Sequence, residues 1–107
     1  MEETLEHLQY PIGRFTLPQT VSEAEILDAI HKISGLPLRM LEAVRQIPPE
    51  GLENPYRPGG WTIRQVVHHV ADSHMNAYIR FKLALTEDKP VIKPYKEAAW
   101  AKLHDSE

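Results

Sequence analysis

The sequence contains no cysteine, so it can form neither a disulfide nor a thiolate metal site. Any metal would have to be bound by histidine and carboxylate side chains. The sequence also lacks a basic run, and its net charge of −3 argues against a nucleic-acid partner. No apolar stretch approaches the roughly 20 residues that span a bilayer, and the acidic, polar N-terminus is unlike a signal peptide. We therefore expect a cytoplasmic protein with no membrane and no nucleic-acid partner.

The composition itself is typical of a globular protein, with 42% hydrophobic and 25% charged residues. A length of 107 residues suits one domain, 1–107, or part of one. Residues 1–21 are expected to form an extended arm, because Pro11, Gly13 and Pro18 would interrupt any helix there.

The first long helix is predicted at 22–47. Ser22 followed by Glu25 has the spacing of a capping box. Apolar residues then recur with helical spacing, at Ile26, Leu27, Ile30, Ile33, Leu41, Val44 and Ile47. Pro37 lies inside this stripe, but the apolar register continues past it. We therefore expect one kinked helix rather than two helices joined by a turn.

A second long helix is predicted at 62–86, after a loop rich in proline and glycine, and Thr62 with Gln65 forms a second capping-box pattern. A short helix is expected at 95–103. No segment alternates as a strand would, so the class is all-α. Two long amphipathic helices must bury their apolar stripes, and a four-helix bundle is the natural solution. This chain supplies about half of such a bundle, so we expect either part of a larger domain or a homodimer.

Three histidines lie in the second helix, at positions 68, 69 and 74. Two histidines of one helix bind the same metal when they are three or four residues apart, and these spacings are one, five and six. The helix can therefore donate only one ligand. His74 falls on the apolar stripe, which favours a half-buried structural histidine. His68 and Asp72 are one turn apart, which favours a surface hydrogen bond.

His69 lies on a different stripe of the second helix. The residues four, seven and eleven positions after it are Ser73, Asn76 and Arg80. This stripe is polar but carries one formal charge, whereas a solvated helix face usually carries more. Two interpretations remain open from the pattern: a mildly polar surface, or one wall of a cleft.

Three stretches resemble the DinB/YfiT superfamily, and in particular its YfiT-like metal-dependent hydrolases of Gram-positive bacteria. They are YPIGRF at 10–15, NPYRPGGWTIRQVVHHVADSHMNAYIRFKLALTED at 54–88 and IKPYKEAAWAKL at 92–103. The resemblance implies a DinB-like four-helix bundle with an extended N-terminal arm. It also implies a divalent metal, zinc or nickel, held by three histidines. The first ligand follows the GGW turn and precedes a branched apolar residue, a position that His69 occupies here. Trp61 would anchor the start of the helix.

The other two ligands of the family come from an HxxxH pair on the last helix, and this sequence has no such pair. It therefore resembles the N-terminal part of the family domain. It also departs from the family at Lys96, where an acidic residue is expected. The resemblance implies a metal-dependent hydrolase, or a thiol-S-transferase that uses a low-molecular-weight thiol such as bacillithiol. Arg80 would then bind an anionic group of a small-molecule substrate. The alternative is a non-catalytic half-domain that folds by self-association.

Overall fold

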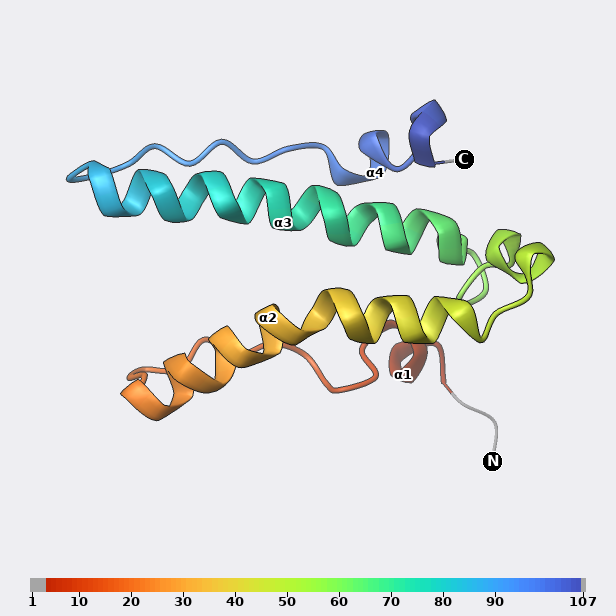
Figure 1. The fold of residues 1–107 in the computed structure, drawn as a ribbon, viewed down its shortest axis with the longest axis horizontal. Coiled ribbons are helices and arrows are strands. Elements are labelled where there is room, and N and C mark those ends of the chain that lie inside the picture. The colour runs from red at the N-terminus through yellow and green to blue at the C-terminus, as the bar shows by residue number, and fades with distance from the viewer. Residues whose placement is uncertain (1–3, 107) are drawn as a thin grey trace. The chain divides into compact units, whose positions relative to one another are not determined.

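A computed structural model describes residues 4–106, and these residues form helices joined by turns and extended segments (Figure 1). The elements are α1 (Leu5–Gln9), α2 (Glu23–Arg45), the 3-10 turn η1 (Pro49–Glu53), α3 (Ile63–Thr86), α4 (Glu97–Trp100) and the 3-10 turn η2 (His104–Ser106). Within the described residues, β pairing is limited to an isolated bridge between Pro55 and Thr62. The all-α prediction is confirmed. The chain divides into two compact units between Leu52 and Glu53, which are described in turn.

The first unit begins with α1, which corrects the prediction of an extended arm over 1–21. The Thr4 hydroxyl caps this helix by accepting from the His7 backbone N–H over 3.1 Å. The helix ends before Pro11, because proline disfavours helical geometry in the residue that precedes it. The chain is non-helical from Pro11 to Ser22, as predicted. The first three residues of the predicted arm lie outside the described part.

The helix α2 begins at Glu23 because the Ser22 hydroxyl accepts from the Glu25 backbone N–H over 3.2 Å. The capping box predicted from these two residues forms only in half. The Glu25 carboxylate accepts from the Ser22 hydroxyl, at 3.2 Å, instead of from the Ser22 backbone N–H. The Ser22 backbone N–H, which a full capping box would pair, is therefore not paired by the Glu25 side chain.

Pro37 lies inside α2, and the helix continues through it, as the apolar register predicted. Proline has no backbone N–H, so the carbonyl of Ile33 loses its usual helical partner. Across this segment the Arg39 guanidinium donates to the Lys32 carbonyl over 2.6 Å. Figure 1 shows α2 changing direction partway along its length. The prediction of one kinked helix is confirmed.

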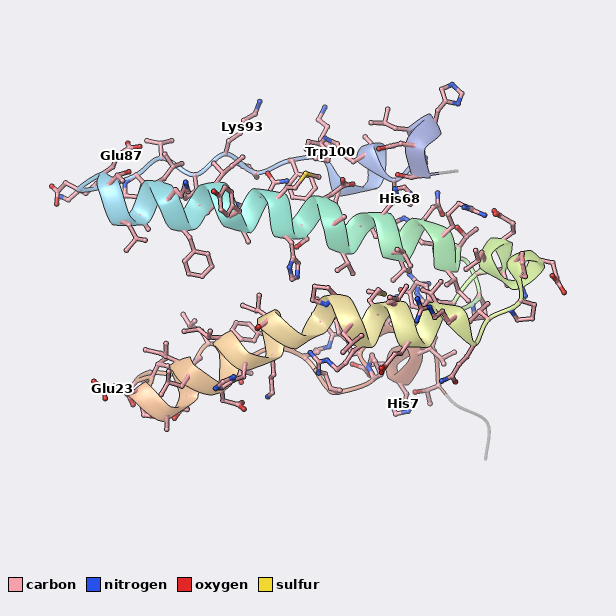
Figure 2. All side chains as sticks on the ribbon, viewed as in Figure 1. His7, Glu23, His68, Glu87, Lys93 and Trp100 are labelled. Carbon is pink, nitrogen blue, oxygen red and sulfur yellow. The ribbon has the colours of Figure 1, made fainter. Side chains whose placement is uncertain are left out.

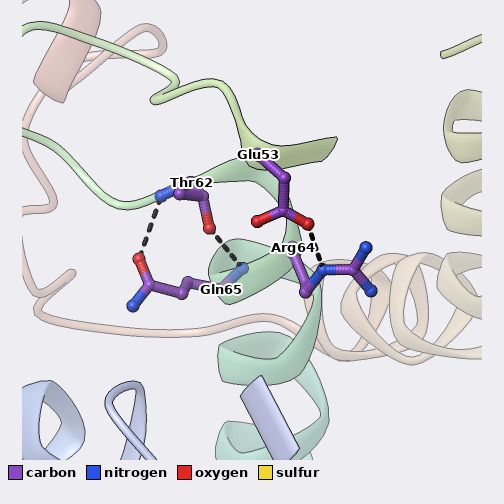
Figure 3. A network of polar contacts seen from close by, with 4 residues as sticks. All are labelled: Glu53, Thr62, Arg64 and Gln65. Atoms are coloured by element: carbon purple, nitrogen blue, oxygen red, sulfur yellow. Dashed lines mark hydrogen bonds and ion pairs between the residues drawn. The ribbon is translucent and has the colours of Figure 1, made fainter. Parts of the chain in front are cut away.

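The second unit is organised around α3, which begins one residue after Thr62 and carries a complete capping box (Figure 3). The Gln65 N–H donates to the Thr62 hydroxyl over 3.1 Å, and the Gln65 side-chain oxygen accepts from the Thr62 N–H over 3.0 Å. Beside it, Arg64 pairs with Glu53 over 2.7 Å, which ties the first turn of α3 to the preceding loop.

After α3 the chain reverses and runs back beside it as an extended segment followed by α4 (Figure 1). Two hydrogen bonds hold this return segment, which we define as residues 87–106. Arg80 donates to the Lys93 carbonyl over 3.1 Å, and Gln65 donates to the Ala101 carbonyl over 2.9 Å. The short helix covers Glu97–Trp100 instead of the predicted 95–103, because Lys96 provides no side-chain cap and the chain turns after Trp100.

Burial is concentrated at the end of the return segment. Among the described residues, Ala101 and Ser106 are the buried ones, each 1% exposed. The large apolar side chains of both stripes stay substantially exposed, such as Ile26 at 48% and Phe81 at 63%. No described helix combines the length and the apolar character needed to cross a membrane.

Candidate functional site

The GGW turn sets the direction in which the chain enters α3. Gly59 has a φ of 71°, a conformation that side chains disfavour. A Cβ atom at Gly60 would lie 2.6 Å from Cγ of Arg57 and 2.9 Å from Cε1 of Tyr56. The turn is closed by a 2.9 Å hydrogen bond from the Tyr56 N–H to the Trp61 carbonyl. These constraints fix the backbone of Trp61 immediately before the helix.

The indole of Trp61 packs against the imidazole of His69, two turns into α3. The ring centroids are 4.8 Å apart and the planes are tilted by 58°. The Nδ1 atom of His69 is buried and has no hydrogen-bond partner among the described residues. A buried polar atom without a partner costs free energy, and such atoms are rare unless a function or a missing ligand explains them. A metal ion, or a donor from outside the described residues, would satisfy it.

The other two histidines of α3 have different surroundings. His68 is half-buried, and Figure 2 places it on the side of α3 that faces the return segment. The expected hydrogen bond between His68 and Asp72 does not form within the described residues, so that prediction was wrong. His74 is exposed, so the prediction that it is half-buried was wrong, and its helical position is on the side of α3 opposite Gln65. The structural role predicted for His74 stays a prediction.

Two of the three substrate-pocket candidates lie at a cavity, while their role in binding a substrate stays a prediction. Asn76 and Arg80 contribute to a cavity of about 540 Å³ between α3 and the return segment. Asn76 also donates to the Asp72 carbonyl over 2.8 Å, which holds its amide against the helix. Ser73 is half-buried and is not part of the cavity wall.

The aromatic part of this cavity was not predicted from the sequence. Tyr95 and Trp100 both line it, and their ring centroids are 4.7 Å apart with the planes tilted by 53°. Both residues belong to the short helix that the sequence predicted at 95–103. No sequence pattern indicated that the chain reverses after α3, and that reversal brings the pair opposite Asn76 and Arg80.

The described residues do not assemble a complete metal site. They contain no cluster of three or more histidine, cysteine or carboxylate side chains positioned to hold one ion. His69 fits as a single ligand, because its unpaired Nδ1 atom is buried beside Trp61. The prediction that α3 supplies only one ligand stays a prediction.

Comparison with known proteins places these features in a family context. Residues 35–106 match the DinB superfamily. A protein of Bacillus cereus (strain B4264) and one of Bacillus anthracis (strain A0248), each named "Putative metal-dependent hydrolase", are 57% identical to the chain over 99 residues. The match covers 92% of this chain and 57% of each relative. The chain therefore spans little more than half the length of these curated relatives.

A solved structure is similar as well. YfiT from Bacillus subtilis superposes with a TM-score of 0.88 at 49% identity, over 94% of this chain and 57% of that one. It is described as "a probable metal-dependent hydrolase with an unusual four-helix bundle topology". The bundle class predicted from the sequence is confirmed by this likeness.

Proposed function

This chain belongs to the DinB superfamily, and on that basis we propose that it forms the part of a metal-dependent hydrolase that donates the first metal ligand. One observation supports this role above the others. His69 has a buried and unpaired Nδ1 atom, and its ring is held in place by Trp61. The hydrolase name itself belongs to the relatives, which share 57% of their residues with this chain over the matched region.

The proposed metal is a divalent ion, zinc or nickel, with His69 as one of three histidine ligands. The two further ligands would come from an HxxxH pair outside this chain. When bound, such an ion supplies an open coordination position and a positive charge, which lowers the pKa of water to about 7 or polarises a substrate oxygen. Trp61 keeps the His69 ring oriented, because packing against the indole restricts rotation of the imidazole.

The substrate would be a small molecule bound along α3. Arg80 would pair with an anionic group, since a guanidinium matches the geometry of a carboxylate or phosphate. Asn76 would orient the substrate, and Ser73 would lie between these residues and His69 on the polar stripe of α3, outside the cavity wall. The finer proposal is thiol-S-transfer, in which the small molecule is a low-molecular-weight thiol such as bacillithiol.

A chimera tests this proposal with the chain in a complete protein. This chain would replace the corresponding part of the Bacillus cereus relative, and the product would be assayed before and after chelation. Two assays separate the reactions: hydrolysis of a panel of esters and amides, and conjugation of bacillithiol to monobromobimane. We expect turnover in one assay that chelation removes and zinc or nickel restores. Turnover that survives chelation unchanged would exclude the metal-dependent function.

A second candidate function comes from the apolar stripes. The side chains of Leu41 and Phe81 are 45% and 63% exposed, and other large apolar residues of α2 and α3 are similar. Together with the incomplete metal site, this supports a non-catalytic half-domain that folds as a homodimer. The two functions differ in a simple measurement: the half-domain would self-associate and bind no metal tightly.

A further inference from the structure

The cavity between α3 and the return segment has a size and a lining that suit a ligand. Its volume of about 540 Å³ falls within the range of roughly 300–1,000 Å³ that is usual for small-molecule sites. Much of its wall is apolar, from Ile79 and Leu83 on α3 and from Val91 and Pro94 on the return segment. Such walls favour a ligand with an apolar body.

The charged residues of the lining all have the same sign. They are Arg80, Lys93 and Lys96, and no carboxylate belongs to the lining within the described part of the chain, although the whole sequence has a net charge of −3. Figure 2 shows the Lys93 side chain directed away from α3, so Lys93 contributes its backbone to the cavity and leaves its ammonium outside. The Arg80 guanidinium therefore supplies positive charge at the cavity wall, and Lys96 is a second basic residue of the lining. This charge complements an anion.

The Arg80 guanidinium has unpaired hydrogen-bond donors within the described part of the chain. It donates from Nη2 to the Lys93 carbonyl over 3.1 Å, which fixes the side chain at the cavity wall. A guanidinium carries five N–H donors, and this hydrogen bond uses one of them. The remaining donors have no partner among the described residues. A group held in place with unused donors is well suited to bind a carboxylate through paired hydrogen bonds.

The aromatic pair completes the site. Tyr95 and Trp100 pack together at 4.7 Å, and Trp100 is still 36% exposed. The side chain of Trp100 therefore offers aromatic surface to the cavity that Tyr95 does not cover. Aromatic rings pair favourably with a neighbouring ring in offset or edge-to-face geometry.

We propose that this cavity binds a small organic anion, with its carboxylate on Arg80 and an apolar ring against Trp100. The cavity lies along α3, away from the ligand position at His69. Arg80 lies eleven residues further along α3, which corresponds to roughly 16 Å at the rise of an α-helix. The inference rests on the proposed function only in giving Arg80 an anionic partner, and it requires no metal.

The test uses the chimera that carries this chain, in the presence of a chelator, so that its outcome depends neither on metal chemistry nor on the self-association of the isolated chain. The signals of Trp61 and Trp100 are assigned there by substituting each with phenylalanine. The probe is 2-naphthoate, with neutral 2-naphthamide and ring-free acetate as comparisons. The sequence has two tryptophans, Trp61 and Trp100, and the indole N–H signals in a two-dimensional NMR spectrum separate them. We expect 2-naphthoate to shift the Trp100 signal saturably and to leave Trp61 unmoved. Both comparison compounds should bind with an affinity lower by about tenfold or by a larger factor.

Variants then identify the cation. Arg80→Gln should weaken 2-naphthoate about tenfold, and Arg80→Lys should recover part of the loss, because lysine keeps the charge but not the fork of donors. Lys96→Gln should weaken binding by a smaller factor and should not disturb the fold, since the Lys96 side chain makes no hydrogen bond or ion pair within the described residues. Lys102→Gln is the matched control: it removes the same charge from an exposed residue outside the cavity.

Three results would overturn the proposal. The first is no saturable binding of 2-naphthoate, and the second is equal affinity for 2-naphthoate and 2-naphthamide. The third is an equal loss in Lys96→Gln and Lys102→Gln, which would mean that the anion responds to net charge alone. A chimera that hydrolyses its substrates but fails these tests would refute the anion site and leave the hydrolase function standing.

Discussion

Gln65 donates from its side-chain nitrogen to the carbonyl oxygen of Ala101 over 2.9 Å, although 36 residues separate the two in the chain. The side-chain oxygen of the same residue accepts from the Thr62 N–H and so completes the cap of α3. One amide therefore starts a helix and holds the far end of the return segment. The residue that it holds, Ala101, is 1% exposed.

Gln65→Glu should separate these two roles. A carboxylate still accepts from the Thr62 N–H, as capping boxes with glutamate do, but it has no proton to donate to Ala101. We expect α3 to remain helical while the amides of residues 101–106 exchange faster with solvent, as measured by hydrogen exchange. Thr62→Ala is the control, because it should cost about 1 kcal/mol of stability through the lost cap and keep the bond to Ala101. Equal acceleration at Ala101 in both variants would refute the division of roles.

His69→Ala and His68→Ala test the assignment of the metal ligand. In the chimera that carries this chain, His69→Ala should lose its bound metal. Alanine has no metal-binding atom, and the indole of the neighbouring Trp61 cannot replace the imidazole as a ligand. His68→Ala should retain most of it, since the neighbouring residue points to another side of α3. Elemental analysis of the purified proteins gives the answer. Equal metal content in His69→Ala and the unsubstituted chimera would rule out His69.

Pro37→Ala tests the kink in α2. Alanine restores the missing N–H and removes the clash with the preceding turn, and proline inside a helix costs about 3 kcal/mol relative to alanine. We expect helix content by circular dichroism to be equal or higher, and the free energy of unfolding to rise by up to about that amount. A loss of helix content would show that the bend at Pro37 is required by the packing of the complete protein.

The isolated chain should not be a stable monomer. Fully burying a large apolar side chain contributes about 1.5–3 kcal/mol, and most such side chains in this chain stay exposed. We expect sedimentation to show a homodimer that pairs the stripes, or an aggregating species. Zinc should bind weakly, because a dimer brings only two copies of His69. A compact monomer that melts cooperatively and binds zinc tightly would contradict both statements.

The helices that the sequence predicted well are the ones with strong local signals. The helices α2 and α3 each have their own N-terminal capping residue and a long apolar stripe. Each observed boundary lies within two residues of the predicted one. The helix α1 was missed because it has only five residues, too few for a period to be recognised, and its cap at Thr4 lies within a stretch read as extended. Short helices depend on their neighbours more than on their own periodicity.

The candidate site was predictable only where one helix carries it. The polar stripe of α3 pointed to Asn76 and Arg80, and both line the cavity. Their partners Tyr95 and Trp100 come from a segment whose path is set by a chain reversal and by two long-range hydrogen bonds, neither of which has a local pattern. For His69 the pattern left two interpretations open, and only the family resemblance chose between them.

The exposed apolar stripes affect the amount of the protein that a cell can maintain. Chaperones and proteases recognise extended apolar surface of the kind that α2 and α3 present when nothing covers it. We expect a chain in this condition to be degraded unless a partner, or a second copy, covers this surface first. Its steady-state amount would then follow the supply of whatever covers the stripes more closely than its own rate of synthesis.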